Sequence, residues 1–237
     1  MIKAVLFDFR DTLVDVSKAR EAQLEFIYNY VKKRGVNISF EVFREKSKEA
    51  GAAIIHTFPK NMYIHNWGML INKNLLESLG VKVEGRDFEK LMNEMDVVFI
   101  ANVSLYPDAT TILNFLKMKD VKMGAVIDGT SKRERQIIAK LGLSNYLSVI
   151  VISEEVGKNK FSLLPLQKAL EQLQCPAGEV MVVGDRIDKD IAPANKLGCI
   201  AIKLERTQGR FANMKPERSE DRPRHVISKL SELAEFF

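Results

Sequence analysis

The sequence has few of the residues that build cross-linked or metal-stapled folds. Only two cysteines and three histidines occur among its 237 residues, and the cysteines, Cys175 and Cys199, form no CxxC pair. A disulfide framework or a zinc site needs several such residues at short spacing, so neither is expected. Both cysteines are predicted to be reduced thiols of a core built from the apolar residues, which make up 46% of the chain.

Long apolar runs and a targeting pattern at the N-terminus are also absent. Residues 4–7 and 180–183 are among the longest apolar runs, and they fall far short of the roughly 20 residues that a membrane span requires. The N-terminus enters a strand-like run at Ile2 without a basic region or a cleavage site. We therefore expect a cytoplasmic protein that does not enter a membrane.

No dense block of one charge is present, although the formal net charge is +5. The most basic stretch, residues 206–224, is interrupted by Glu217, Glu220 and Asp221 and contains almost no aromatic residues. Surfaces that bind single-stranded nucleic acid combine basic residues with stacking aromatic rings. The stretch is therefore interpreted as a solvated loop, and the positive balance fits a small anionic substrate better than nucleic acid.

Short apolar runs that resemble buried strands alternate with helical patterns over most of the chain. This alternation predicts an α/β fold, a Rossmann-like parallel sheet with helices on both faces. The expected strands are residues 2–8, 122–127, 148–152, 179–183 and 199–203, and the expected helices between them are residues 132–141, 163–173 and 188–197.

Residues 16–104 break this alternation and show one helical pattern after another. In the first pattern Ser17 is placed to cap the helix N-terminus and Gly35 to close its C-terminus. Further helices are expected at residues 40–56, 62–79 and 88–101. The sequence thus predicts an all-helical domain, residues 16–104, inserted into a core domain formed by residues 1–15 and 105–237.

Candidate functional residues cluster just after predicted strands. They lie in three segments, residues 8–13, 158–160 and 184–190. In a parallel sheet the ligand crevice lies outside the carboxyl ends of the strands, so acids at these positions are the first candidates. Each segment alone is a weak signal, because an acid after a strand is often only a helix cap or a turn former.

Together these segments resemble the motifs of the haloacid dehalogenase (HAD) superfamily. VLFDFRDTLVD is similar to the first motif, an apolar strand followed by DxDGT, and VIDGT resembles the second. SEEVGKNK resembles the third motif, and VVGDRIDKDIAPANKLG is similar to the fourth, GDxxxxD before a helix. The resemblance covers nearly the whole chain and implies a HAD-like hydrolase of the type whose cap is the helical insertion.

The resemblance also implies a magnesium-dependent phosphatase for a small phosphorylated metabolite. Asp8 would attack phosphorus and form an aspartyl-phosphate that water then hydrolyses. Mg²⁺ would be held by Asp8, the backbone carbonyl of Arg10 and Asp185, with Asp190 orienting that shell. Lys160 would hold the nucleophile and offset developing phosphoryl charge.

Three positions depart from the family pattern. Arg10 stands where the second Asp normally acts as general acid and base, and a guanidinium stays protonated. Asp11 replaces a usual Gly and could supply a carboxylate from another direction. Ile127 replaces the Ser or Thr of the second motif, so we expect Gly129 and Thr130 to supply the phosphate contacts.

The direction of the Arg10 side chain is left open by the sequence. An inward Arg10 and Mg²⁺ repel each other strongly, so they should exclude one another. Either Arg10 turns toward the substrate and binds an anionic group, or it replaces the cation. Thr12 in the same loop and Arg20 on the first inserted helix complete the predicted substrate contacts.

Two other functions remain open at this point. One is a metal-independent hydrolase similar to 2-haloacid dehalogenases, whose first motif also lacks the second Asp. That branch resembles SNxxD at the fourth motif, whereas Gly184 and Asp185 here suit a divalent cation. The other is a catalytically silent relative that binds a ligand or a protein partner.

Overall fold

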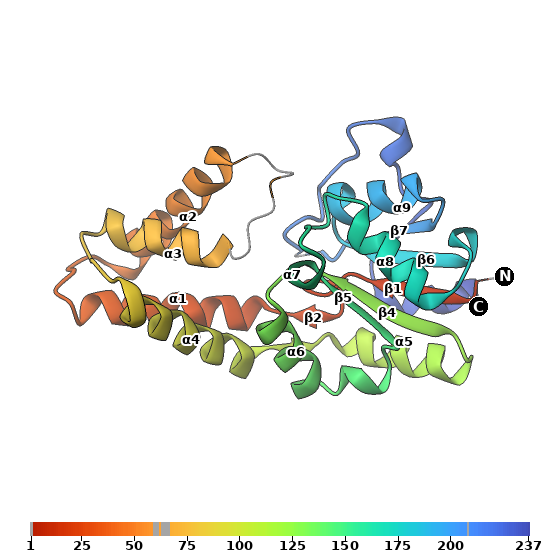
Figure 1. Cartoon of the computed structure of the whole chain (residues 1–237), viewed down its shortest axis with the longest axis horizontal. Coiled ribbons are helices and arrows are strands. Elements are labelled where there is room, and N and C mark those ends of the chain that lie inside the picture. The colour runs from red at the N-terminus through yellow and green to blue at the C-terminus, as the bar shows by residue number, and fades with distance from the viewer. Residues whose placement is uncertain (1, 59–61, 63–66, 208) are drawn as a thin grey trace. The chain divides into compact units, whose positions relative to one another are not determined.

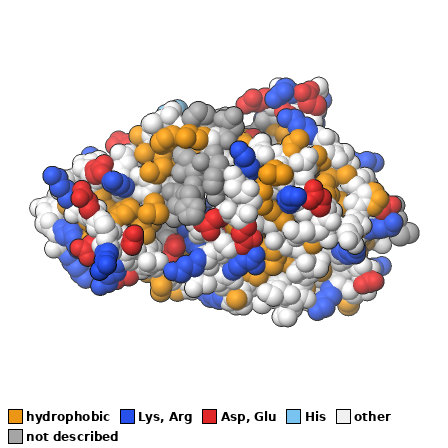
Figure 2. Space-filling view, viewed as in Figure 1, with side chains coloured by type: hydrophobic (Ala, Val, Ile, Leu, Met, Phe, Trp, Pro, Cys, Tyr) orange, Lys and Arg blue, Asp and Glu red, His pale blue; other side chains and the backbone are white. Residues whose placement is uncertain are grey.

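The computed structural model describes residues 2–58, 62, 67–207 and 209–237. The chain divides into two compact units, one formed by Met1–Asp15 with Ser104–Phe237 and the other by Val16–Val103. Basic and acidic side chains are interspersed over the face seen in Figure 2 rather than gathered in one block. Both cysteines are free thiols, with Cys199 buried and Cys175 partly buried.

The first unit is built on a six-stranded sheet in which every neighbouring pair is parallel (Figure 1). The strand order is β5-β4-β1-β6-β7-β8. The strands are β1 (Ala4–Phe7), β4 (Lys122–Ile127), β5 (Val149–Ile152), β6 (Val180–Gly184), β7 (Ile200–Leu204) and β8 (His225–Ile227). The continuous burial of β1 and β6 reflects a parallel sheet covered by helices, and the parallel order of the strands confirms the predicted α/β class.

Helices and short helical segments connect these strands or follow the last of them. The α-helices are α5 (Pro107–Met118), α6 (Ser131–Lys140), α7 (Ser153–Val156), α8 (Leu164–Leu173) and α9 (Ala192–Lys196). The 3₁₀ turns are η1 (Leu143–Asn145), η2 (Ala177–Glu179), η4 (Ser219–Asp221) and η5 (Leu230–Phe236), and η3 (Ile187–Ile191) is a π-helical turn. Buried side chains of α8, such as Leu166 and Leu173, pack on those of the sheet.

Three features of this unit differ from the sequence predictions. The helix expected at residues 188–197 is divided into η3 and α9, and Pro193, which has no N–H to donate, stands in the first turn of α9. The prediction omitted α5 and β8. It also omitted the antiparallel pair β2 (Val14–Asp15) and β3 (Ser104–Leu105), where the chain leaves and re-enters the core unit.

The second unit is helical in its described residues and has its own apolar core. Its helices are α1 (Ser17–Lys32), α2 (Phe40–Thr57), α3 (Trp67–Ser78) and α4 (Gly85–Asn102). Ile27, Phe43, Leu75 and Leu91 are among the buried residues that these helices contribute. Across the described part of the chain, no helix has both the length and the apolar character that a membrane span requires.

Two boundary predictions in this unit need correction. Ser17 is the first residue of α1 rather than its N-cap, since Val16 occupies the cap position. A serine does cap the next helix, because Ser39 Oγ accepts a hydrogen bond from the Val42 amide at 3.3 Å. The helix expected to start at residue 62 begins at Trp67, and residues 63–66 lie outside the described residues.

Candidate active site

Two of the predicted acids leave the sheet side by side. Asp8 follows β1 and Asp185 follows β6, and these strands are parallel neighbours in which Phe7 pairs with Val183. The Asp8 amide continues the ladder by donating to the Val183 carbonyl at 2.8 Å. Each of Asp8, Asp185 and Asp190 offers a carboxylate oxygen, and these oxygens all lie within 4.8 Å of one another. The carboxyl ends of β1 and β6 therefore form an acidic triad, Asp8, Asp185 and Asp190.

Asp190 is fixed by its own turn. Its Oδ2 accepts a hydrogen bond from the Arg186 amide at 2.9 Å, and the residue is only 2% exposed. The carboxylate packs against Gly184, where an added Cβ would lie 2.6 Å from the Cβ of Asp190. The glycine of the fourth motif is thus required because any side chain there would displace Asp190.

Lys160 bridges two members of the acidic triad. Its Nζ lies 2.5 Å from Asp8 Oδ1 and 2.6 Å from Asp190 Oδ1. Burial by itself lowers the pKa of this ammonium, but Asp190, Asp8 and Asp128 outweigh burial and raise the pKa above its ordinary value. On the other side of the nucleophile, the Thr12 hydroxyl donates to Asp8 Oδ2 at 3.0 Å. Both oxygens of Asp8 are therefore held.

The acidic triad fits a divalent cation. Burial raises the pKa of Asp185 to about 8, and the carboxylates of Asp8 and Asp190 add to the shift. Its Oδ2 is buried and makes no hydrogen bond to any described residue. Carboxylate oxygens are the ligands that Mg²⁺ prefers, and a cation here would offset three acids that share one ammonium. The predicted carbonyl ligand, at Arg10, belongs to the loop that carries Asp8.

Arg10 adopts an arrangement that the sequence did not suggest. Its guanidinium forms an ion pair with Glu134 of α6, and the Glu134 side chain is 0% exposed. Nε of the neighbouring Arg133 lies 3.2 Å from the same carboxylate oxygen, Oε1. The guanidinium of Arg10 is thus paired with a buried carboxylate of α6. A role for Arg10 in substrate binding or in place of the cation stays a prediction.

Asp11 occupies the position of the family's glycine and takes a glycine-like conformation. Its φ is 63°, and its amide donates to the Val14 carbonyl at 2.8 Å. Aspartate tolerates this left-handed region better than most residues. Asp11 is nearly buried, and its charge contributes to the raised pKa of Asp185. The replacement carboxylate therefore lies within electrostatic range of the acidic triad.

In the second motif, one of the two donors predicted to contact phosphate already has a partner within the protein. Ile127 is buried in β4, and the Gly129 amide already donates to the Ser153 hydroxyl at 3.0 Å. Thr130 is the N-cap residue of α6, and its hydroxyl makes no capping hydrogen bond. Of the two donors predicted here, the Gly129 amide is thus engaged within the protein, because α7 brings Ser153 beside it.

Asp128, which follows Ile127, contacts two lysines of the site. Its Oδ1 accepts a hydrogen bond from the Lys160 amide at 2.9 Å, and its Oδ2 lies 2.6 Å from Lys189 Nζ. Although burial favours its neutral form, Lys189 and Lys160 lower the pKa of this carboxyl. Asp128 therefore carries a compensated charge and fixes the backbone of the loop that presents Lys160.

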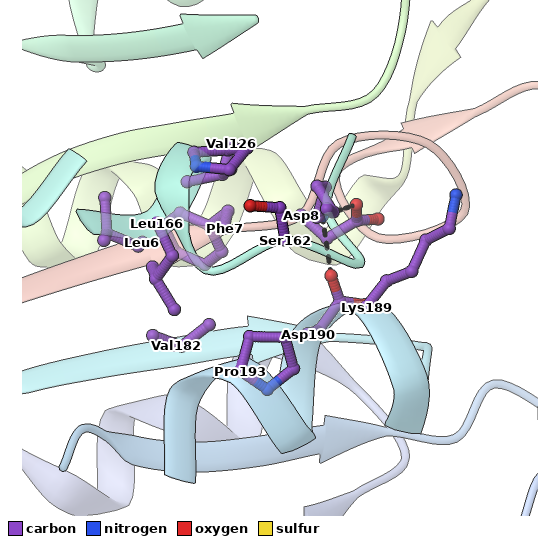
Figure 3. A pocket seen from close by; sticks show the side chains of 12 residues that line it. Leu6, Phe7, Asp8, Val126, Ser162, Leu166, Val182, Lys189, Asp190 and Pro193 are labelled. Atoms are coloured by element: carbon purple, nitrogen blue, oxygen red, sulfur yellow. Dashed lines mark hydrogen bonds and ion pairs between the residues drawn. The ribbon is translucent and has the colours of Figure 1, made fainter. Parts of the chain in front are cut away.

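A small cavity borders these groups (Figure 3). Asp8, Asp190, Lys189 and Ser162 lie toward one end of it, and apolar side chains such as Leu6 line the other. All predicted site residues except one belong to the core unit. The exception is Arg20, which is exposed on α1 of the helical unit.

Three residues with a part in this arrangement were not identified from the sequence. Glu134 gave no signal, because its partner Arg10 is 124 positions away. Lys189 could have been noticed, since it directly precedes Asp190. Arg206 belongs to the stretch interpreted as a solvated loop, yet it pairs with Asp108 at 3.0 Å and donates to the Thr12 carbonyl at 2.9 Å. For Arg206 that interpretation was wrong.

This arrangement of acids and lysine agrees with the comparison to protein families. A model of the haloacid dehalogenase-like hydrolases matches residues 2–198. The chain belongs to this family. The match confirms the predicted superfamily and the hydrolase class, and it covers all the motifs quoted above.

Individual relatives extend over the full length. A glyceraldehyde 3-phosphate phosphatase of Methanopyrus kandleri is 29% identical over 247 aligned positions, covering 99% of each chain. A ribulose-1,5-bisphosphate 5-phosphatase of Halopiger xanaduensis is 25% identical, again with 99% of each chain covered. The structure of the HAD hydrolase YfnB of Bacillus subtilis bound to magnesium superposes with a TM-score of 0.78 at 20% identity. It covers 99% of this chain and 98% of its own, and it shows the shared fold.

Proposed function

We propose that this protein is a Mg²⁺-dependent phosphatase that hydrolyses a small sugar phosphate through an aspartyl-phosphate on Asp8. The observation that carries the proposal is the geometry of Asp8, with Lys160 on one oxygen, Thr12 on the other and two further acids beside it. The phosphatases of Methanopyrus kandleri and Halopiger xanaduensis, whose names specify small sugar phosphates, support the substrate class.

The held carboxylate of Asp8 is the nucleophile. One of its oxygens forms a bond to phosphorus while the bond from phosphorus to the departing sugar oxygen breaks. Lys160 keeps the carboxylate in place and offsets negative charge that develops on the phosphoryl oxygens. Bound at the acidic triad, Mg²⁺ would supply further positive charge for the nucleophile and the phosphoryl group.

The departing sugar oxygen needs a proton, and Arg10 cannot supply one. Asp11 is the candidate acid, because its carboxylate lies close enough to the acidic triad to raise the pKa of Asp185. It would donate the proton to the leaving oxygen and later accept one from the water that cleaves the aspartyl-phosphate. Since its position differs from that of the usual acid, we expect slow turnover that falls as the leaving-group pKa rises.

The helical unit, residues 16–103, is proposed as the cap. A cap excludes water while the acyl-phosphate exists and supplies contacts to the organic part of the substrate, with Arg20 as the predicted contact. Limited proteolysis near residues 14–16 and 105–107 tests this assignment. Cleavage should be slowed by a bound phosphate analogue, and an unchanged rate with binding shown independently would contradict a closing cap.

The function itself is tested by phosphate release. The wild-type protein should hydrolyse p-nitrophenyl phosphate and, more slowly, glyceraldehyde 3-phosphate, and chelation of divalent ions should stop both reactions. Chloride release from 2-chloropropionate without metal would show the dehalogenase activity instead. Metal binding without phosphate release from any sugar phosphate would indicate a silent relative.

A further inference from the structure

We propose that Glu134 is a positioning residue for the metal site, which acts by holding the guanidinium of Arg10 away from the acidic triad. The inference rests on the metal-dependent function proposed above. It assigns a role to a residue of α6 outside the segments that carry the chemistry. It also explains how an arginine in the nucleophile loop is compatible with a divalent cation.

The site around Glu134 is built to hold a carboxylate. The side chain is fully buried, and Arg10 and Arg133 both pair with its Oε1. Gly129 provides the space for it, because a Cβ at that position would lie 2.7 Å from the Glu134 Cδ. A side chain at residue 129 would therefore push Glu134 out of reach of Arg10.

Without Glu134, electrostatic attraction would draw the guanidinium of Arg10 toward the acidic triad. It follows Asp8 by two residues, so their Cα atoms lie within about 7 Å of one another. The acidic triad combines three carboxylates with the single ammonium of Lys160. A released guanidinium would be attracted to this excess negative charge and would repel a divalent ion. At about 8 Å and an effective dielectric constant near 20, that repulsion weakens Mg²⁺ binding by roughly ten- to a thousandfold once solvent screening is allowed for.

Calorimetric titration of the full chain with Mg²⁺ tests the proposal without any need for turnover. Glu134→Gln removes the charge and keeps the shape, and it should weaken Mg²⁺ binding by at least about tenfold. Arg10→Met alone should leave the affinity within about threefold of wild type, because Glu134 already offsets that arginine. The double variant Arg10→Met with Glu134→Gln should recover the affinity of Arg10→Met, since no guanidinium remains to move.

Arg133→Met is the matched control. It removes the second arginine beside Glu134 but leaves the Arg10 pair, so Mg²⁺ affinity should not change. Circular dichroism and thermal unfolding establish that each variant is folded. If Glu134→Gln does not fold, Arg10→Met still tests the proposal. A tenfold or larger gain in Mg²⁺ affinity would contradict it, because Arg10 would then repel the metal in the wild type.

Other outcomes also overturn the inference. A folded Glu134→Gln protein with wild-type Mg²⁺ affinity would show that Glu134 does not hold Arg10 away from the acidic triad. A double variant as weak as Glu134→Gln would mean that packing, not the arginine, sets the affinity. Failure of the proposed function is separate, because a wild type that binds Mg²⁺ with this pattern but releases no phosphate leaves the role of Glu134 intact. If the wild-type protein binds no Mg²⁺, the proposed function and the role of Glu134 are both contradicted.

Discussion

The two sides of the active site differ in what they retain. The turn after β6 keeps the acids Asp185 and Asp190, and Lys160, from the loop before α8, pairs with Asp190. On the side of the nucleophile loop and β4, Arg10 has replaced the proton donor and Ile127 the hydroxyl. The acids and the lysine of the family pattern are therefore retained on one side, whereas a proton donor and a phosphate hydrogen-bond donor of that pattern are replaced on the other.

The largest effect is expected at the Asp8 carboxylate, because both sides of the site act on this nucleophile. Asp8→Asn removes the nucleophile but keeps the shape, so turnover of p-nitrophenyl phosphate should fall by at least about a thousandfold. Thr12→Val removes only the hydrogen bond to Oδ2 and should cost about tenfold. Similar losses in both variants would contradict a nucleophilic role for Asp8.

Asp11→Gly tests whether the altered side still transfers protons. Turnover of an alkyl phosphate should fall by about a hundredfold, and that of p-nitrophenyl phosphate by less, because nitrophenolate leaves without a proton. Glycine relieves the φ of 63°, so the free energy of unfolding should rise by up to about 1 kcal/mol. Urea denaturation measures this gain. Full activity in Asp11→Gly would exclude Asp11 as the acid.

Replacing Arg10 with aspartate should restore the family's acid on the altered side of the site. Arg10→Asp would place a new carboxylate near Glu134, so it is best combined with Glu134→Gln. At saturating Mg²⁺ we expect alkyl phosphate turnover to rise by about tenfold, and aryl phosphate turnover to change less. The reference protein is Glu134→Gln alone. A decrease for alkyl phosphates would show that Arg10 takes a positive part in the reaction.

Asp128 links the two sides, because it lies after β4 and supports Lys160. Asp128→Ala should lower kcat by about tenfold and change KM less, since Lys160 loses the acceptor for its backbone amide. Asp128→Asn keeps an oxygen acceptor at the same place and should recover most of the loss. Equal losses in both variants would show that charge, not positioning, is what Asp128 contributes.

The most gradual effect concerns the pH dependence of Mg²⁺ binding on the metal side. In the metal-free protein, burial and neighbouring acids raise the pKa of Asp185 to about 8. A proton must leave before this carboxyl binds a cation, so Mg²⁺ affinity should fall as the pH drops below about 8, by at most about tenfold per unit. Titrations between pH 6 and pH 9 measure this slope. Asp185→Asn should flatten it as well as weaken binding.

The fold was predictable because its signals are local. Strand and helix patterns, together with glycine and proline positions, indicated the strands β1, β4, β5, β6 and β7 to within a few residues. The missed strand β8 is three residues long, and two of these are exposed, so its apolar pattern is weak. The turn η3 was missed because Asp190 bonds back to the Arg186 amide, a contact that periodicity does not show.

By itself, the sequence determined the family, the parallel core and the candidate roles of Asp8, Lys160 and Asp185, because each lies in a short motif beside a recognisable strand or loop. Only the tertiary structure decided which charges meet. Arg10 pairs with Glu134 across 124 positions, and Arg206 reaches the Thr12 carbonyl across 194. Such pairs depend on the order of strands in the sheet and on the loops that follow them. A single sequence contains no local pattern that connects the two partners.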